Sequence, residues 1–124
     1  MSSSKSLLAM AVTLSVLPLL AVAFALQADA GPAKGDAAKG KPLYTQKCVA
    51  CHKADGSGGV KLTGNPTPSF KDAKRMATVT DDKLRECIVN GVIKSGMVAW
   101  GKTGQLKPAQ IEDVIAYIRT LPKK

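Results

Sequence analysis

The sequence is poor in aromatic, histidine and acidic residues, and each shortage argues against a class of protein. Aromatic residues make up 4% of the 124 residues, which leaves few rings on which nucleic-acid bases could stack. The single histidine, His52, leaves a zinc site or an acid–base pair without its remaining parts. The 9 acidic residues are outnumbered by 18 basic ones, and the net charge of +9 points to an acidic partner or surface.

The first 30 residues differ from the rest and have the layout of a removable leader. An uncharged apolar run over residues 7–26 follows a basic start, and small residues stand at Ala28 and Ala30. This pattern is typical of a secretory signal peptide and predicts cleavage after Ala30, which leaves residues 31–124 as one periplasmic domain. The alternative is an uncleaved membrane anchor, because about 20 apolar residues can span a bilayer. Pro18 within the run favours removal.

The most specific motif is Cys48-Val49-Ala50-Cys51-His52, whose CxxCH spacing is typical of covalent c-type haem attachment. Two thiols three positions apart can each bond to one vinyl group of a porphyrin, and the histidine that follows places an imidazole under the iron. A domain this short often needs a cofactor to complete its core. The alternatives are a thioredoxin-like redox pair, half a zinc site or an ordinary disulfide. The first two lack their other parts here, because no βαβ pattern and no second histidine occur.

Three further segments complete a resemblance to the small bacterial class I cytochromes c: Gly40-Lys41-Pro42-Leu43-Tyr44, Ser95-Gly96-Met97-Val98-Ala99-Trp100 and residues 111–121. The resemblance covers nearly all of residues 31–124, the cytochrome c domain. It implies an all-α class I cytochrome c fold, with three to five short helices around one covalently bound haem c. It also implies a soluble one-electron carrier, not an enzyme, that shuttles electrons between larger redox complexes of a respiratory or photosynthetic chain.

The residue on the second face of the iron separates a carrier from a catalyst. After removal of the leader, only Met76 and Met97 can supply a thioether. Met97 lies in a glycine-flanked loop that resembles the family's GMPxW segment, with Val98 in place of the proline, so we expect Met97 to be the sixth ligand. Met76 precedes a capped helix and is expected to fill the core. Ligation by His52 and Met97 should raise the reduction potential.

Two alternative functions stay open at this point. One is a haem enzyme or gas sensor whose sixth iron position is open or easily opened, although no distal acid–base pair can be seen. The other is a membrane-anchored electron-transfer module on an uncleaved leader.

The first helix is expected to begin at Asp36, its candidate N-cap, and to run to the Cys48 region. Pro42 within it either kinks the helix or marks a restart with Lys41 as the cap, and the sequence leaves both open. The family resemblance implies that this helix crosses the last one where Gly40 meets Tyr117.

Two later helices are marked by their ends. Thr80 opens a short helix that closes at Gly91. Cys87 lies on its apolar face and is expected to be buried and inert, whereas the alternatives are a reactive thiol or an intermolecular bridge. Pro108 fits the first turn of the last helix, over which apolar residues recur at helical spacing.

The family resemblance implies roles for two residues near the expected haem. A proline carbonyl there accepts the second imidazole N–H of the proximal histidine, and Pro66 is the candidate in this chain. Trp100 either donates a hydrogen bond to a haem propionate or packs in the core.

Lysines flank both the CxxCH motif and the methionine loop: Lys41, Lys47, Lys53, Lys94 and Lys102. They form either a basic ring that steers the acidic docking surfaces of redox complexes or an ordinary solvated surface. We therefore expect a monomer with protein partners, no nucleic-acid partner, and peripheral membrane contact only through those partners.

Overall fold

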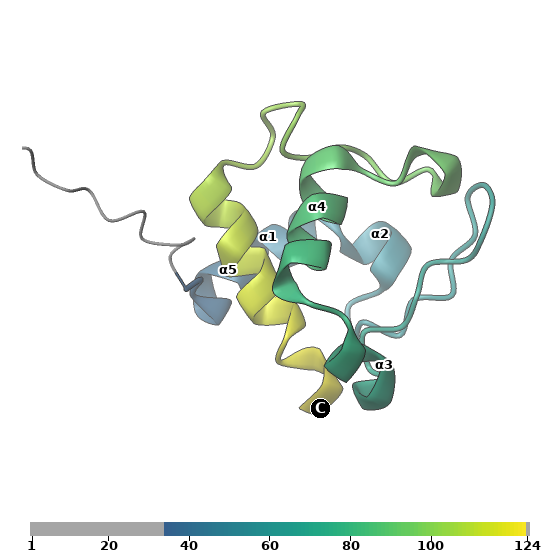
Figure 1. Cartoon of the computed structure of the whole chain (residues 1–124), viewed down its shortest axis with the longest axis horizontal. Coiled ribbons are helices and arrows are strands. Elements are labelled where there is room, and N and C mark those ends of the chain that lie inside the picture. Colours follow the sequence, from purple (N-terminus) through teal and green to yellow (C-terminus); the bar gives the residue numbers. More distant parts are fainter. Residues whose placement is uncertain (1–33, 124) are drawn as a thin grey trace, which may run out of the picture.

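Two helices cross at the centre of the molecule, and the shorter helices are arranged around that crossing (Figure 1). The computed structural model describes residues 34–123, so the predicted leader lies outside the described residues. The elements in chain order are α1 (Ala37–Lys47), α2 (Val49–His52), α3 (Ala73–Thr78), α4 (Asp81–Asn90), η1 (Ile93–Ser95), α5 (Pro108–Ile118) and η2 (Leu121–Lys123). The five α-helices confirm the predicted all-α class, and β structure within this range is limited to one isolated bridge.

None of the helices within residues 34–123 has both the length and the hydrophobicity that a membrane crossing requires.

Helix α1 begins at the predicted cap and passes through its proline. The Asp36 carboxylate accepts hydrogen bonds from the backbone N–H groups of Ala38, at 2.8 Å, and Lys39, at 3.4 Å. The helix then continues through Pro42 to Lys47, so no restart occurs after Lys41. Ala38 and Pro42 are both exposed, and the Ala38 carbonyl that loses its helical hydrogen bond to the proline can therefore bind water.

The α1–α5 crossing is a contact between backbones, because glycines stand where the helices meet. A Cβ at Gly40 would lie 1.9 Å from the carbonyl oxygen of Asp113, and one at Gly35 would lie 1.9 Å from that of Glu112. Such distances leave no room for a side chain at Gly40 on α1 or at Gly35, which lies just before the N-cap of α1. The backbone N–H of Asp36 adds a hydrogen bond of 2.7 Å to the Asp113 carboxylate.

The partner of Gly40 differs from the expected one by a helical turn. Gly40 meets the α5 backbone at Asp113 and Val114, whereas Tyr117 packs on Tyr44 with ring centroids 5.1 Å apart. The expectation of a Gly40–Tyr117 contact was therefore wrong in register, although the crossing at a small residue is correct.

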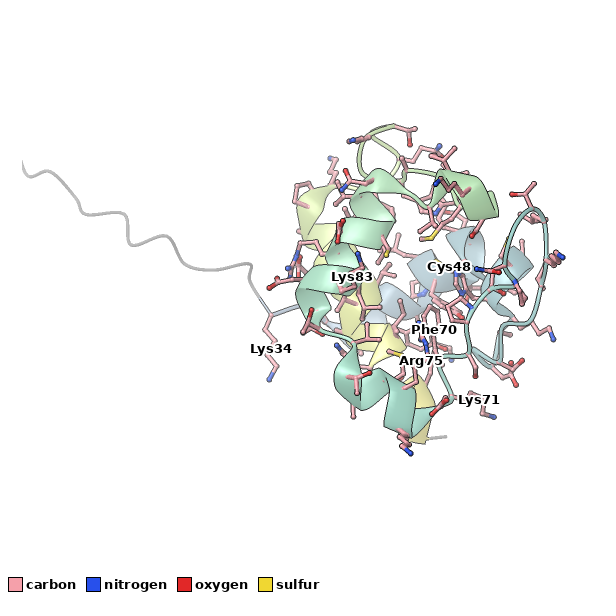
Figure 2. All side chains as sticks on the ribbon, turned by 45° about the vertical axis from the view of Figure 1, so that its right-hand side comes forward. Lys34, Cys48, Phe70, Lys71, Arg75 and Lys83 are labelled. Carbon is pink, nitrogen blue, oxygen red and sulfur yellow. The ribbon has the colours of Figure 1, made fainter. Side chains whose placement is uncertain are left out.

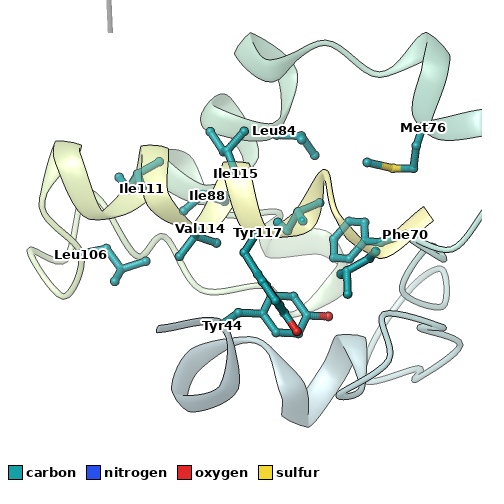
Figure 3. Packing of buried hydrophobic residues seen from close by; sticks show 12 residues of the cluster. Tyr44, Phe70, Met76, Leu84, Ile88, Leu106, Ile111, Val114, Ile115 and Tyr117 are labelled. Carbon is teal, nitrogen blue, oxygen red and sulfur yellow. The ribbon is translucent and has the colours of Figure 1, made fainter. Parts of the chain in front are cut away.

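The apolar core lies on the inner face of α5, between α1 and α4 (Figure 3). Val114 has no exposed surface, and Met76 is 3% exposed, so its predicted role as a core residue is confirmed. A fully buried side chain of this size contributes roughly 1.5–3 kcal/mol relative to an exposed one. The core residues are Tyr44, Phe70, Met76, Leu84, Ile88, Leu106, Ile111, Val114, Ile115, Tyr117, Ile118 and Leu121.

Helix α4 begins and ends as the sequence predicts, and α5 begins as predicted. The Thr80 hydroxyl accepts a hydrogen bond of 3.1 Å from the Lys83 backbone N–H. Gly91, with a φ of 70°, ends α4, and its N–H donates to the Cys87 carbonyl at 2.9 Å. Pro108 is the first residue of α5.

Two arginines brace these helices. The guanidinium of Arg85 forks onto the Glu112 carboxylate, with N–O distances of 2.5 and 2.8 Å, and so ties α4 to α5. Arg119, just after α5, donates to the Asp81 carboxylate at 2.7 Å and to the Met76 carbonyl at 2.8 Å. The end of α5 thereby holds α3 in place.

Candidate haem-binding site

An apolar cavity of about 290 Å³ separates the CxxCH segment from α4. Three of the four predicted site residues, Cys48, His52 and Met97, line it, although the first and the last are 49 positions apart in the sequence. Cys51 is half-buried on the same helical turn as His52 and is not part of the wall. Figure 2 shows Cys48 and Phe70 in the middle of the molecule, between α4 and the loop that carries residues 53–69.

The CxxCH segment is a single tight turn. The backbone N–H groups of Cys51 and His52 both donate to the Cys48 carbonyl, at 3.2 and 2.8 Å. The turn stops at Lys53, whose φ of 62° is a left-handed conformation that costs a residue with a side chain roughly 1–2 kcal/mol. The Tyr44 hydroxyl donates to the Lys53 carbonyl at 2.9 Å, so α1 fixes the end of the motif.

All three cysteines are free thiols in the structure. Burial, and then the charge of Cys51, raise the pKa of the Cys48 thiol to about 12. A neutral thiol suits the apolar wall, and a thioether formed from it would be neutral as well. Cys87, which we expected to be buried, is only partly buried and lines the same cavity from α4.

The His52 imidazole is held on its flat face and is 8% exposed. It stacks on Phe70, with ring centroids 4.6 Å apart and planes inclined by 16°. Burial lowers the pKa of His52, and the Pro68 carbonyl opposes that shift. Burial therefore favours the neutral ring, which is the form that binds a metal ion.

One ring nitrogen of His52, Nδ1, is buried and makes no hydrogen bond of ordinary geometry to any described residue. A group in the cavity would meet the other ring nitrogen, because Nδ1 has no surface open to the cavity. An imidazole, two thiols at CxxCH spacing and a thioether around one apolar cavity are the donor set that a c-type haem needs.

The proline carbonyl that acts on the imidazole belongs to Pro68, so the choice of Pro66 was wrong by two residues. The loop between them is held by its own hydrogen bonds. Thr67 donates from its hydroxyl to the Cys51 carbonyl at 2.7 Å, and its backbone N–H donates to the Val60 carbonyl at 2.8 Å. These bonds fix Pro68 beside the motif.

The loop that carries Met97 is shaped by its backbone. Val92 and Met97 exchange two N–H to carbonyl hydrogen bonds, both of 3.1 Å. Gly96 has a φ of 79°, and a Cβ at Gly91 would lie 2.6 Å from the Met97 carbonyl oxygen. The half-buried Met97 lines the cavity, whereas Met76 does not.

Trp100 packs against the core and is not part of the cavity wall. The Lys47 ammonium lies 5.4 Å from the centre of the indole ring, a cation–π contact. This packing agrees with one of the two interpretations of Trp100, and a hydrogen bond from its indole N–H to a haem propionate stays a prediction.

Sequence reasoning missed Thr67, Phe70 and Arg75, all of which line the cavity. They fall between the two recognisable motifs, in a segment without helical or strand periodicity. The only signal there is the turn cluster Asn65-Pro66-Thr67-Pro68, which predicts a loop but not what the loop contacts.

Comparison with known proteins gives one consistent result. Residues 35–118 match the family model described as cytochrome C oxidase, cbb3-type, subunit III. A cytochrome c6 of Rippkaea orientalis is 36% identical over 107 residues, which cover 85% of this chain and 88% of that protein. A cytochrome c6 of Limnospira maxima is 32% identical over 84 residues, which cover 68% of this chain and 91% of that protein.

Two further relatives bear on size and fold. The cbb3-type cytochrome c oxidase subunit FixP of Bradyrhizobium sp. is 34% identical over 92 residues, which cover 68% of this chain but 30% of FixP. A solved structure, the KustC0563 c-type cytochrome, superposes with a TM-score of 0.53 at 27% identity, over 66% of this chain and 95% of that one.

Proposed function

This chain belongs to the class I cytochromes c, which hold one haem c covalently, and from that premise we propose that it is a soluble one-electron carrier rather than an enzyme. The observation that carries the proposal is the apolar cavity with His52 and Met97 in its wall. A site closed by two protein ligands leaves no iron position for a substrate.

Each predicted site residue has a separate role in this proposal. Cys48 and Cys51 bind the haem through thioether bonds, and His52 and Met97 are the fifth and sixth iron ligands. The haem supplies the one-electron couple, and a thioether ligand favours its ferrous state and raises the reduction potential. The chain keeps the imidazole oriented through Phe70 and excludes water with apolar walls.

The backbone hydrogen bonds around Met97 support fast electron transfer. The paired hydrogen bonds between Val92 and Met97 hold the loop in one conformation. The sixth ligand then stays in place in both oxidation states, so little has to move when an electron arrives or leaves.

Carbon monoxide tests whether the sixth coordination position of the iron is already occupied by a protein ligand. We expect the visible spectrum of the ferrous protein, made with a c-type maturation system, to stay unchanged when carbon monoxide is added. Met97→Ala should open the iron and shift the spectrum, whereas Met76→Ala, a core methionine, is the matched control and should not. The reverse pattern would overturn the ligand assignment. A prompt shift in the unaltered protein would favour the haem enzyme or gas sensor.

The proposed location is the periplasm, with the leader removed after Ala30 and the carrier monomeric. N-terminal sequencing of the exported protein should find Gly31, and Met1 or Ser2 would contradict cleavage. The likeness to a cbb3-type oxidase subunit favours one alternative, an electron-transfer module that stays on the membrane. Fractionation before and after a salt wash separates the two, because an uncleaved anchor resists salt.

The proposed docking surface is an apolar patch beside the methionine loop. Leu62, Ile93 and Val98 are 58%, 74% and 40% exposed, large fractions for apolar side chains. Leu62 packs against the loop, since a Cβ at Gly96 would lie 3.2 Å from its Cβ. Exposed lysines adjoin the patch at Lys61 and Lys94. The patch and its charges support a redox partner with an apolar, acidic docking surface.

Of the five lysines expected to form a basic ring, Lys47 contributes least. It is half-buried over Trp100, and its ammonium donates to Gln105 at 3.4 Å.

The charge on the proposed docking surface is tested by its effect on the rate at which the ferrous protein is oxidised. Oxidation of the ferrous protein by ferricyanide, an anion, should slow as salt is added, because screening weakens the attraction. Lys94→Gln should reduce both the rate and its salt dependence. Lys34→Gln is the matched control, since Lys34 lies on the side of the molecule away from the loop of residues 53–69 (Figure 2). Equal effects of the two variants would favour an ordinary solvated surface.

A further inference from the structure

The three arginines of the chain differ in their partners. Arg85 is forked onto Glu112, and Arg119 is bonded to Asp81 and to a backbone carbonyl. Arg75 forms no ion pair with any residue of the described range. Within the described residues, its guanidinium makes one weak hydrogen bond, 3.7 Å from Nη1 to the sulfur of Met76. Arg75 is therefore the arginine whose charge lacks a counter-charge.

The position of Arg75 in the cavity wall is fixed by its backbone. Its N–H donates to the Asp72 carboxylate at 2.9 Å, which places the residue in the first turn of α3. The other end of α3 is held by Arg119. The Arg75 side chain is half-buried and lines the cavity, and Figure 2 shows it near Phe70.

The cavity wall contains positive charge and no carboxylate. Lys83 is its other cationic residue, but its ammonium is bonded to Glu86 at 2.7 Å. A guanidinium stays charged at all ordinary pH values, and a charge in an apolar wall is stabilised by an anion placed against it. An anionic group on whatever fills the cavity would supply that counter-charge.

Haem c brings two carboxylates, its propionates, and this inference rests on the proposed function. We propose that Arg75 is a positioning residue that binds one haem propionate and keeps it ionised. The planar guanidinium matches a carboxylate through two parallel hydrogen bonds. Its positive charge also offsets the propionate's negative charge, which favours the ferrous state and raises the reduction potential.

The test is the reduction potential of the haem-loaded protein measured against pH. The unaltered protein should show a nearly constant potential from about pH 5 to 8, because the paired propionate holds no proton there. Arg75→Gln should have a lower potential at neutral pH. Its potential should also fall as pH rises, because an unpaired propionate in an apolar site loses its proton within this range.

Two variants separate the proposed contact from a general effect of charge. Lys74→Gln removes one positive charge from the exposed neighbour of Arg75, and it should lower the potential less and add no pH dependence. Arg75→Lys keeps the charge and should recover much of the potential. Far-ultraviolet circular dichroism of each variant checks that the helices are intact.

The outcomes distinguish this inference from the proposed function. An Arg75→Gln protein that holds haem and matches Lys74→Gln in potential and pH profile would overturn the role of Arg75. Should that variant not accumulate, the unaltered protein still decides, because a potential that falls between about pH 5 and 8 means the propionate is not held ionised. Absence of covalent haem in the unaltered protein would instead overturn the proposed function.

Discussion

The α1–α5 crossing and the Met97 loop are built in opposite ways. At the crossing, α1 touches α5 through Gly40, Gly35 just before α1 touches α5 as well, and the adjacent Val114 is fully buried. The loop instead exposes Ile93 by 74% and is held by backbone hydrogen bonds between Val92 and Met97. Burial thus stabilises the crossing, whereas glycine geometry and backbone pairing shape the loop. Changes at the crossing should affect the free energy of unfolding first, and changes in the loop should affect the iron ligand first.

The largest effect is expected from Gly40→Ala, because Gly40 lies where α1 and α5 cross. The new Cβ would lie 1.9 Å from the Asp113 carbonyl oxygen, so the two helices must separate. We expect the free energy of unfolding to fall by about 3 kcal/mol, measured by urea unfolding of the haem-loaded protein. Lys39→Ala, an exposed neighbour on the same helix, is the control and should change it by no more than about 0.5 kcal/mol. If Gly40→Ala lost no more free energy of unfolding than Lys39→Ala, the crossing would tolerate a methyl group.

A smaller and different effect is expected in the loop from Gly91→Ala. Gly91 and Gly104 have nearly the same φ, 70° and 71°, but a Cβ at Gly91 would lie 2.6 Å from the Met97 carbonyl oxygen, whereas one at Gly104 meets nothing within 4 Å. Gly104→Ala should cost about 1 kcal/mol of backbone strain, and Gly91→Ala about 2 kcal/mol. Only Gly91→Ala should let carbon monoxide bind the ferrous iron. Binding by both variants would mean that loop strain in general, and not the contact with Met97, controls the ligand.

The smallest effect concerns Tyr44, which joins the crossing to the CxxCH turn. Its ring packs on Tyr117 at the crossing, and its hydroxyl donates to the Lys53 carbonyl at the end of the CxxCH turn. Tyr44→Phe should therefore lower the free energy of unfolding by about 1 kcal/mol at neutral pH, measured by urea unfolding.

The pH dependence of that difference follows from the phenol. Burial, the largest cause, raises the pKa of Tyr44 above its ordinary value of 10.0. The folded protein thus keeps the phenol neutral where the unfolded chain ionises, and this contribution is full below pH 10.0 and lost as pH rises above it. Because phenylalanine has no such proton, the gap between the two proteins should narrow above pH 10.0. A constant gap would contradict the burial of the phenol.

Helix ends could be predicted because their chemistry is local. Asp36, Thr80 and Pro108 stand at the starts of helices and Gly91 at an end, where the side chain or backbone geometry of each satisfies its own neighbours. The residue that Gly40 contacts could not be predicted in this way, because it depends on the register of two helices that are distant in sequence. An error of one turn moved the expected contact from Asp113 to Tyr117.

The candidate site was predictable where a short motif carries the chemistry. The structure brings Cys48, His52 and Met97 to one cavity, as their proposed roles require. Phe70 and Pro68 escaped prediction because their contacts with His52 depend on an irregular loop that returns to the motif. Arg75 has no sequence signal at all, since only the folded chain shows that it lacks a carboxylate.

The bond between the Asp36 backbone and the Asp113 side chain joins residues 77 positions apart, and it sets an order of events. As long as the crossing has not formed, Cys48, Cys51 and His52 belong to a chain without a closed cavity, because Ile118 of α5 is one of the cavity's walls. The two thiols of the exported chain are thus open to haem attachment before α5 docks, and folding then closes around them.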